Sequence, residues 1–363
     1  METYRAIGLM SGSSLDGLDV AYCHFTHDKN RWSFRILHTE VVPYSEAWIL
    51  RLRSLPRATA RELSESHAAL GRYFGEAVKA FVAQHGLHNQ VDLVASHGHT
   101  LFHFPDKHFT TQIGDGAAIA QCSGLPVVCD LRTADIAAGG QGTPIVPIGD
   151  WKLFGEYEYC LNIGGIANIS CHTGRGRVAF DICCANQVLN RLAATLGHEY
   201  DEGGKIAASG QLQAELLNQL NALEYYQRAY PKSLDNSYSS EVISPILDSF
   251  PLPAEDQLRS FTEHIALQVA AHIRMMAYIE KQPVSPSARL LCTGGGAFNH
   301  YLMERIQSLS GVQVHVPDEQ TVKFKEALVM ALMGVLRLRG EENVLCSVTG
   351  AAHNTVGGAI YHP

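Results

Sequence analysis

Two turns in this sequence carry the residue types that bind phosphate groups. Each turn follows a short apolar strand, contains glycine with small polar residues, and leads into another strand; the first spans Ser11 to Asp19 and the second spans Asn162 to Asn168. Glycine lets backbone N–H groups converge on an oxyanion, and Ser and Asn side chains add further donors. A pair of facing turns of this type is what a two-lobed phosphotransferase needs.

A third glycine-rich segment, Gly294 to Gly296, follows the apolar stretch 288–292 and precedes a predicted helix near Phe298. Here the backbone could approach a purine or a ribose closely, and the helix N-terminus would favour negative charge. Any one of the three segments alone is compatible with an ordinary turn. Their occurrence together favours a nucleotide site, which is not a P-loop because G-x-x-x-x-G-K-[ST] does not occur.

Asp181 is the candidate general base. It closes an apolar strand shortly after the second turn, before a predicted helix at 186–197. A carboxylate in such a place is suited to general base catalysis, which contributes about 10² to 10⁴-fold to a rate. The alternative is that Asp181 is the N-cap of the following helix. Capping alone does not explain why an apolar strand leads directly to this residue.

Polar residues at 96–115 are suited to binding a sugar. The first part of this segment, 96–108, contains four histidines, but Asp106 is the one nearby acidic residue there and no cysteine is in range, so neutral imidazoles in a substrate loop are favoured over a transition-metal site. The amide of Gln112 and the carboxylate of Asp115 could bind sugar hydroxyls. Metal ligands cannot be assigned from the sequence.

Two further residues have an ordinary and a functional interpretation. The glycine-rich run around Gln141 is either a plain linker or a hinge that presents this amide to a cleft. Glu326 begins a predicted helix, where an acidic residue suits the helix dipole. It could equally face the substrate or a metal ion.

Composition indicates an ordinary globular protein. The 363 residues are 46% hydrophobic and carry a net charge of −8, so no basic surface is expected for nucleic acid. Nine cysteines without a CxxC pair favour reduced thiols and a cytoplasmic location. We expect no signal peptide and no membrane association, because no apolar run approaches the roughly 18 residues of a membrane span.

The order of predicted elements suggests two related α/β lobes. Strands are expected at 4–10, 18–26, 32–42, 91–96 and 126–129, with helices at 45–54, 60–85 and 116–123 and a long loop after residue 96. The pattern recurs with strands at 157–163, 166–172, 177–182 and 288–292 and helices at 186–197, 211–222 and 255–281. The predicted lobes are 1–138, completed by 345–363, and 139–344.

On these segments the chain resembles the anhydro-N-acetylmuramic acid kinase family of the sugar kinase, Hsp70 and actin superfamily. The matching segments run in order along nearly the whole chain: 8–19, 97–100, 112–115, 137–147, 161–169, 180–181, 207–210, 231–233 and 294–299. The resemblance implies a two-lobed, actin-like, ribonuclease H-like α/β fold with an interlobe cleft. It also implies an ATP-dependent and Mg²⁺-dependent enzyme of peptidoglycan recycling. Such an enzyme opens 1,6-anhydro-N-acetylmuramic acid and phosphorylates O6, giving N-acetylmuramic acid 6-phosphate and ADP.

The resemblance and the local reasoning together assign roles to individual residues. Asp181 is the expected base. The residues expected at ATP are Gly12, Ser13, Ser14, Leu15, Asp16, Gly17, Leu18, Asp19, Asn162, Gly164, Gly165, Asn168, Gly294, Gly295, Gly296 and Asn299. Those expected around the sugar are His97, Gly98, Thr100, Gln112, Gly114, Asp115, Gln141, Asn186 and Glu326. Kinases of this type are often dimers, and apolar helices could form the interface of a homodimer.

The chain departs from the family pattern after Asp181. The family often has Thr-Gly-Pro-Gly-Asn there, whereas this chain has Ile182, Cys183, Cys184, Ala185 and Asn186. Asn186 keeps its place, but the glycines that permit close backbone approach are replaced. His99 also stands where Gln is common.

Two other functions are compatible with parts of this pattern. A glycoside hydrolase for an amino sugar would need two carboxylates about 5 to 9.5 Å apart, such as Asp181 with Asp115 or Glu326, but it would leave three glycine loops unexplained. An actin-like nucleotide switch would use the same phosphate turns without catalysis, and it would not need the polar segment 96–115.

Overall fold

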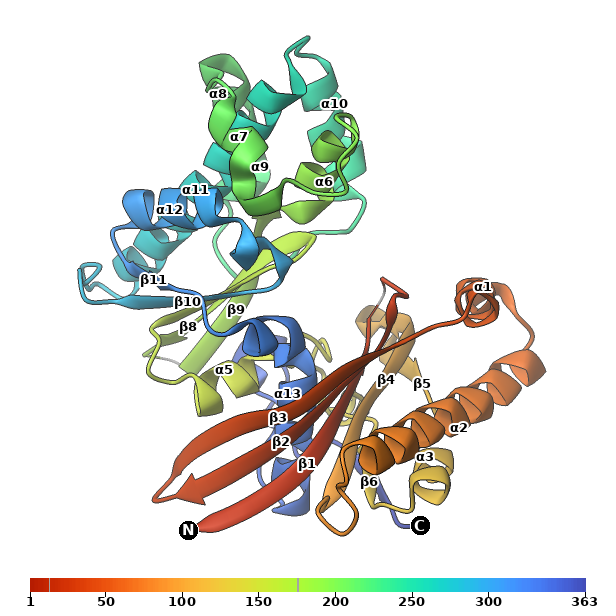
Figure 1. The fold of residues 1–363 in the computed structure, drawn as a ribbon. Coiled ribbons are helices and arrows are strands. Elements are labelled where there is room, and N and C mark those ends of the chain that lie inside the picture. Colours follow the sequence, from red (N-terminus) through yellow and green to blue (C-terminus); the bar gives the residue numbers. More distant parts are fainter. Residues whose placement is uncertain (13, 175) are drawn as a thin grey trace. The chain divides into compact units, whose positions relative to one another are not determined.

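The chain forms two compact units, which we describe separately. The computed structural model describes residues 1–12, 14–174 and 176–363, so Ser13 lies outside the described residues. One unit comprises Met1–Leu153 with Phe324–Pro363, and the other comprises Phe154–Lys323 (Figure 1). These boundaries differ from those expected at 138/139 and 344/345. The first unit is larger because α5 (Pro147–Leu153) packs against its third strand and most of the last long helix covers its sheet.

The first unit contains a seven-stranded sheet in the order β12-β6-β4-β1-β2-β3, with β5 paired to β4. β1, β2 and β3 form an antiparallel meander, and β4 and β6 add in parallel on the other side of β1. The strands are β1 (Glu2–Ser11), β2 (Gly17–Asp28), β3 (Arg31–Pro43), β4 (Leu93–Phe104), β5 (Phe109–Ile113), β6 (Val127–Cys129) and β12 (Ala359–Tyr361).

Helices cover both faces of this sheet (Figure 1). Alternating residues of β1 show why: Ile7 and Leu9 are fully buried in one core with Phe74 of α2 (Ala60–Gln84), whereas Gly8 faces α13 (Glu319–Leu338). A Cβ atom on Gly8 would lie 1.8 Å from the carbonyl oxygen of Ala327, so only glycine permits this close approach. The helices are α1 (Glu46–Ser54), α2 (Ala60–Gln84), α3 (Gly116–Ser123), α4 (Thr133–Ala137), α5, α14 (Cys346–Thr349) and the greater part of α13 (Glu319–Leu338).

The second unit repeats the strand order of the first. Its five-stranded sheet has the order β11-β10-β7-β8-β9, with an antiparallel meander of β7, β8 and β9 and with β10 and β11 added in parallel beside β7. The strands are β7 (Tyr159–Ile163), β8 (Ile166–Thr173), β9 (Gly176–Cys184), β10 (Arg289–Thr293) and β11 (Gln313–His315). The repeated topology confirms the predicted pair of related α/β lobes and the ribonuclease H-like, actin-like fold class.

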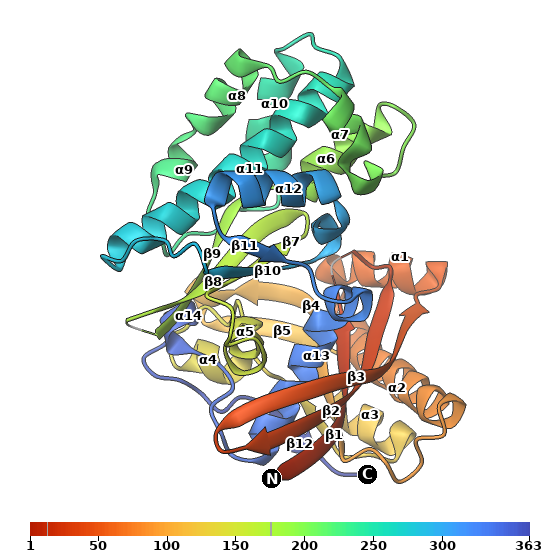
Figure 2. The same cartoon turned by 60° about the vertical axis from the view of Figure 1, so that its left-hand side comes forward.

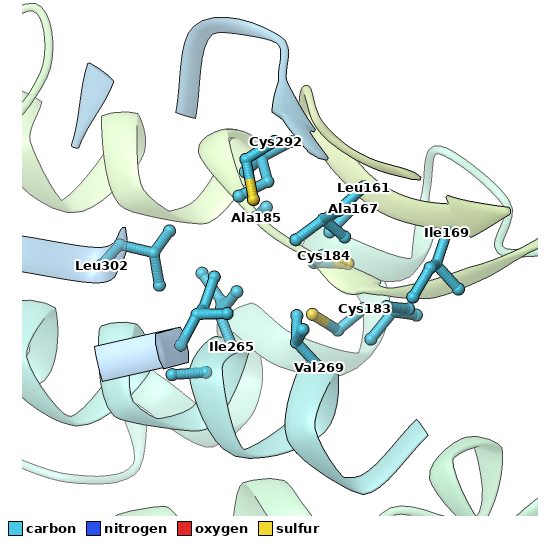
Figure 3. Close-up of a cluster of buried hydrophobic side chains, with 14 of the residues drawn as sticks. Leu161, Ala167, Ile169, Cys183, Cys184, Ala185, Ile265, Val269, Cys292 and Leu302 are labelled. Atoms are coloured by element: carbon cyan, nitrogen blue, oxygen red, sulfur yellow. The ribbon is translucent and has the colours of Figure 1, made fainter. Parts of the chain in front are cut away.

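Helices of the second unit pack on one face of its sheet and enclose a separate core (Figure 2). Figure 3 shows part of this core, in which Leu161, Ile169 and Cys183 from the sheet meet Ile265 and Val269 from α11. The helices are α6 (Asn186–Ala194), α7 (Lys205–Ser209), α8 (Ala214–Asn221), α9 (Glu224–Gln227), α10 (Ser244–Asp248), α11 (Ala254–Ile279) and α12 (His300–Ser310), with a short turn of 3₁₀ helix, η5 (Gly295–Phe298).

The prediction of a long loop after residue 96 is wrong. Instead of ending near residue 96, β4 continues through the histidine-rich segment to Phe104, because β5 pairs with its second half as an antiparallel partner. Gly98 has a φ of +73° within this strand, and the register with β1 shifts nearby. Because of these irregularities, the sequence pattern does not reveal the strand.

Among the described residues, none of the helices combines the length and the apolar composition of a membrane-spanning segment.

Candidate active site

Three polar residues form a row across the sheet of the second unit. Asn162 of β7 pairs with Asn168 of β8, and Asn168 pairs with Asp181 of β9. Directly opposed residues of antiparallel strands share one face of a sheet. Their neighbours Leu161, Ile169 and Phe180 belong to the core, so the row lies on the opposite face. The structure therefore brings together the expected base and two expected nucleotide ligands.

Asp181 is held by three hydrogen bonds from one segment. Its carboxylate Oδ2 accepts from the backbone N–H of Leu234 at 2.9 Å, and its carbonyl oxygen accepts from the Tyr225 hydroxyl at 2.7 Å. Its own N–H donates to the carbonyl oxygen of Lys232 at 3.3 Å. The segment 225–234 thus fixes both the backbone and one carboxylate oxygen of Asp181.

The environment of Asp181 suits a base. Its side chain is partly buried, and this desolvation raises the pKa of the carboxyl above its ordinary value, while the Leu234 N–H opposes the rise. The alternative role as an N-cap is not observed. Ala185 occupies the N-cap position of α6, and no side chain there accepts a capping hydrogen bond.

The second and third glycine loops meet in this unit. Gly294 has a φ of +80°, and a Cβ atom there would lie 2.7 Å from both Asn162 Oδ1 and the carbonyl oxygen of Ile163. A Cβ atom on Gly296 would lie 2.2 Å from Ile163 Cγ2. Asn186 joins them, because its amide nitrogen donates to the Ile163 carbonyl at 3.2 Å. These loops need glycine because their backbones approach so closely.

Carbonyl groups of the second turn satisfy the start of α6. The oxygen of Gly164 accepts from Asn186 N–H at 3.0 Å, and the oxygen of Gly165 accepts from the N–H groups of Ala185 and Gln187 at 2.8 and 3.3 Å. The turn therefore caps the helix with its backbone. A Cβ atom on Gly165 would lie 2.8 Å from Gln187 Cγ, so close packing explains why this position is a glycine.

The two cysteines that depart from the family pattern, Cys183 and Cys184, pack in the core of the second unit. Cys183 and Cys184 are fully buried beside Ala167 and Ile169 (Figure 3). Burial raises the pKa of the Cys184 thiol to about 12 and raises that of Cys183 well above its ordinary value. Both thiols are therefore neutral apolar packing groups. Asn186 still reaches the glycine loops despite the lost glycines.

Sequence reasoning missed the glycine pair Gly203 and Gly204. Both have positive φ, and a Cβ atom on Gly204 would lie 2.1 Å from Asn299 Oδ1. Asn299, an expected nucleotide ligand, caps α12 by accepting the N–H of Leu302 at 2.9 Å. Two consecutive glycines before a short helix were the available signal.

The first turn lies in the other unit, between β1 and β2. Gly12 and Ser14 to Asp16 form the tip, Leu15 has a φ of +60°, and the Ser14 hydroxyl donates to Asp16 Oδ1 at 2.7 Å. The next two positions, Gly17 and Leu18, already belong to β2, and Leu18 is fully buried in the core. Among these positions Ser14 and Asp16 are exposed.

Asp19 lies on the face of the sheet opposite to the core residues Leu18 and Val20. Desolvation, with the nearby charges of Asp16 and Glu326, raises the pKa of Asp19 to about 7. Glu326 on α13 keeps contact with solvent, yet the surrounding protein raises the pKa of its carboxyl by desolvation, and Arg132 and Lys325 oppose that rise. The first unit thus contributes a group of mutually repelling carboxylates.

His97 acts on Arg132. Nε2 of His97 accepts a hydrogen bond from Nε of Arg132 at 3.0 Å, so Nδ1 carries the proton and donates to the Gly98 carbonyl at 2.9 Å. Burial and the positive charge of Arg132 lower the pKa of His97 to about 3, which keeps the ring neutral. His97 is buried, and its hydrogen bond orients the half-buried side chain of Arg132, a residue that the sequence analysis did not single out. A lone arginine three residues after the end of β6 was a weak signal.

His99, Thr100 and Gln112 each form side-chain hydrogen bonds within the first unit. His99 Nδ1 lies 3.0 Å from the Ser11 hydroxyl, which also lies 2.6 Å from the Tyr44 hydroxyl. Thr100 and Gln112 are opposite each other on β4 and β5, and the Gln112 amide donates to the Thr100 hydroxyl at 3.3 Å. Thr100 and Gln112 are therefore a cross-strand pair.

Asp115 has a structural role. Its carboxylate accepts from the N–H groups of Ala117 and Ala118 at 2.8 and 3.1 Å and caps α3. Gly114 and Gly98 approach each other where β5 leaves β4. Asp115 is thus engaged by backbone donors and is poorly suited to be the second carboxylate of a glycoside hydrolase.

Gln141 is exposed on a loop that is anchored inside the first unit. Its N–H donates to the carbonyl oxygen of Thr349 at 2.9 Å, and buried Asp135 accepts from the Gly142 N–H and from the Thr349 hydroxyl. The segment expected to be a linker between lobes therefore belongs to one of them. The hydrogen bond between Thr349 and Asp135 could not be predicted from the sequence, because 214 residues separate them.

Comparisons with known proteins agree along the whole chain. A family model described as anhydro-N-acetylmuramic acid kinase matches residues 4–363. A protein of that name from Methylorubrum extorquens is 34% identical over 389 residues, and one from Gloeobacter violaceus is 34% identical over 386 residues; in both, all of each chain is covered. A third, from Vibrio vulnificus, is 32% identical, with 98% of this chain and 97% of the relative covered.

Solved structures also match this chain. Component A of (R)-2-hydroxyglutaryl-CoA dehydratase from Acidaminococcus fermentans is 13% identical, with a TM-score of 0.41 and coverage of 91% of this chain and 96% of that chain.

Proposed function

From the premise that this chain belongs to the anhydro-N-acetylmuramic acid kinase family, we propose that Asp181 is the general base of its reaction. The protein is an ATP-dependent phosphotransferase that acts on 1,6-anhydro-N-acetylmuramic acid and serves peptidoglycan recycling. The base removes a proton from a water molecule as the water attacks the anomeric carbon. The C1–O6 bond breaks, and O6 takes the γ-phosphoryl group of ATP, which gives N-acetylmuramic acid 6-phosphate and ADP.

One observation carries the assignment of Asp181. Asp181 ends a row of polar residues on the face opposite to the core, where one hydrogen bond with the segment 225–234 holds its carboxylate and two hold its backbone. Desolvation raises its pKa above the ordinary aspartate value, which strengthens the carboxylate as a proton acceptor. A fixed carboxylate of this kind can hold a water molecule in line for attack.

The glycine turns are the proposed nucleotide site. Gly294 and Gly296 meet Asn162 and Ile163, so two of the three loops already form one surface in the second unit. In the first unit, the candidate turn is the one that contains Gly12 and Ser14 to Asp16, where Ser14 is exposed. Backbone N–H groups and Asn side chains of such turns stabilise the charge that spreads over phosphate oxygens in phosphoryl transfer.

Carboxylates of the first unit fit Mg²⁺ that arrives with ATP. In the described part of the chain, no group of three or more His, Cys, Asp or Glu side chains is arranged as a metal site. Mg²⁺ in kinases commonly takes one or two carboxylates and completes its shell with phosphates and water. Asp19 and Asp16 would hold it, since a cation relieves the repulsion that contributes to the raised pKa of Asp19. When bound, the ion neutralises phosphate charge.

The sugar is placed by the remaining residues. The cross-strand pair Thr100 and Gln112 offers hydroxyl and amide groups for hydrogen bonds to the sugar. Arg132, oriented by His97 and near Glu326, adds a cation for an anionic substituent. The nine cysteines, all among the described residues, are thiols and not disulfides, which fits the cytoplasmic location that we propose. We also propose that the protein forms a homodimer.

The Asp181→Asn variant tests the proposal. We expect kcat to fall by about 10² to 10⁴-fold with little change in the KM for ATP, measured as ADP release with 1,6-anhydro-N-acetylmuramic acid. Asp235→Asn is the matched control, because Asp235 is an exposed carboxylate of the neighbouring loop. Full turnover by Asp181→Asn would refute the role of Asp181.

A further inference from the structure

A partly buried lysine, whose carbonyl oxygen accepts a hydrogen bond from Asp181, meets a buried histidine. Lys232 Nζ lies 2.8 Å from Nε2 of His272 and donates to the carbonyl oxygen of Tyr225 at 3.1 Å. It also lies 4.5 Å from the centre of the Tyr225 ring. Lys232 is partly buried and His272 is almost fully buried, so neither is an ordinary surface group.

The protonation state of His272 follows from its contacts. Its Nδ1 lies 2.7 Å from the carbonyl oxygen of Gln268, so Nδ1 carries a proton and donates it. Nε2 is therefore the acceptor for the Lys232 ammonium. Burial, together with the charge of Lys232, lowers the pKa of His272 to about 4, which keeps the ring neutral across the physiological range.

These contacts fix the segment that holds Asp181. All three hydrogen bonds to Asp181 come from Tyr225, Lys232 and Leu234. The Lys232 side chain ties two ends of this segment together by bonding to the Tyr225 carbonyl, and it ties the segment to α11 through His272. Phe180 stacks on Tyr230, 5.6 Å between ring centres, and packs against His272, which closes the same cluster.

We propose that Lys232 and His272 are positioning residues for Asp181, and that they act by holding the Leu234 N–H against Asp181 Oδ2. This inference rests on the proposed role of Asp181 as the base. Without the tether, the segment 230–235 would lose its anchor on α11, and the Leu234 hydrogen bond would lengthen or break. The carboxylate would then lose its orientation toward the attacking water.

Several titratable groups surround Lys232. Besides His272 of α11 and Tyr225 of α9, Lys232 faces Cys183 of β9 and Arg228 at the end of α9. Desolvation is the main cause that lowers the pKa of Lys232, to about 8, and Arg228 adds to the effect. The ammonium is thus mostly charged at neutral pH and loses its proton only in the alkaline range.

The test uses variants that separate tethering from charge. Lys232→Met removes both, whereas His272→Leu removes the anchor but leaves the charge of Lys232. His272→Gln keeps an acceptor for Lys232 and a donor for Gln268, and Lys281→Met is the control for loss of an exposed lysine at the end of α11. If Lys232→Met does not fold, the two His272 variants still decide.

Two measurements are made on each variant. The first is the pH dependence of kcat, whose acid limb reports the pKa of the base. The second is an NMR titration of the ¹³C-labelled Asp181 carboxyl in the free protein, assigned with Asp181→Asn. Because the Leu234 N–H lowers the pKa of Asp181, losing it should move both readings to higher pH.

We expect Lys232→Met and His272→Leu to lower kcat about tenfold to hundredfold and to shift both readings upward, while His272→Gln and Lys281→Met resemble the parent. A lower kcat with unchanged pKa readings in both tether variants would overturn the inference, because a merely structural role predicts that result. If Asp181→Asn keeps its turnover, the proposed function fails, and the NMR titration still shows whether the tether exists.

Discussion

The backbone N–H of Leu234 donates a hydrogen bond to Asp181 Oδ2 at 2.9 Å, across 53 residues of sequence. This bond lowers the pKa of the carboxyl, whereas desolvation raises it. The net rise leaves Asp181 a stronger base than an exposed aspartate. In the proposed reaction, the other carboxylate oxygen, Oδ1, accepts the proton of the water molecule.

Removing this donor should shift the acid limb of the rate profile. Leu234→Pro lacks the N–H, so the pKa of Asp181 should rise and activity should fall away at higher pH than in the parent. Leu234→Ala is the control, because it keeps the N–H and loses only apolar side-chain packing. Identical acid limbs in the two variants would contradict the assigned bond.

Gly294 and Gly295 should respond differently to alanine. A Cβ atom on Gly294 would clash with Asn162 Oδ1 and the Ile163 carbonyl, and the φ of +80° is itself unfavourable for alanine. A Cβ atom on Gly295 meets only Asn186 Nδ2, at 3.7 Å. We expect Gly294→Ala to lower the free energy of unfolding by about 1–3 kcal/mol and to raise the KM for ATP.

Urea unfolding and the KM for ATP, measured on both variants, check this prediction. Gly295→Ala should stay near the parent in stability. Equal losses of stability in the two variants would show that the close contact at Gly294 does not exist.

Ionisation of Asp19 should oppose folding at alkaline pH. Desolvation, with Asp16 and Glu326, raises its pKa to about 7 in the folded protein, so the folded state holds this proton more tightly than the unfolded chain does. The stabilisation is complete below about pH 4, the ordinary aspartate pKa, and it is lost as the pH rises through 7. Asp19→Asn cannot ionise and should therefore gain Tm relative to the parent as the pH increases.

Thermal unfolding at pH 5 and pH 8 without nucleotide measures this effect. The difference in Tm between Asp19→Asn and the parent should be larger at pH 8. Asp106→Asn, at an exposed position of the same unit, provides the control. A difference in Tm that does not change between the two pH values would refute the raised pKa of Asp19.

Cys183 and Cys184 should resist alkylation in the native protein. Both are fully buried, and burial raises the pKa of each thiol, so almost no thiolate is present at pH 8. Iodoacetamide labelling followed by peptide mass spectrometry should modify the partly exposed Cys122 and Cys346 first. Rapid native labelling of the adjacent pair would show that these residues line an accessible surface instead of the core.

Much of the fold followed from local patterns. The meander of β1 to β3, the helix α3 and the amphipathic helix α11 were predicted within a few residues, because alternation and 3.6-residue periodicity report buried faces directly. The extension of β4 was not, since a glycine with positive φ and a register shift interrupt its alternation. The unit boundaries also depend on packing of α5 and α13, which no local pattern contains.

The candidate site was predictable where a residue carries its own signal. Asp181 stood out because an apolar strand leads to it, and the glycine loops stood out by composition. Arg132 and the Lys232–His272 pair did not, because their importance comes from partners 35 and 40 residues away. The resemblance covered Lys232 by its motif, but only the hydrogen bonds connect it to Asp181.

Isotope labelling tests the central claim, that water attacks the anomeric carbon as the ring opens and O6 is phosphorylated. The protein is incubated with ATP, Mg²⁺ and 1,6-anhydro-N-acetylmuramic acid in ¹⁸O-labelled water, and the product is analysed by mass spectrometry. Unlabelled N-acetylmuramic acid 6-phosphate kept in the same solvent measures slow exchange at C1. One ¹⁸O atom at C1 together with one phosphoryl group is the predicted result, and a phosphorylated sugar without the label would contradict it.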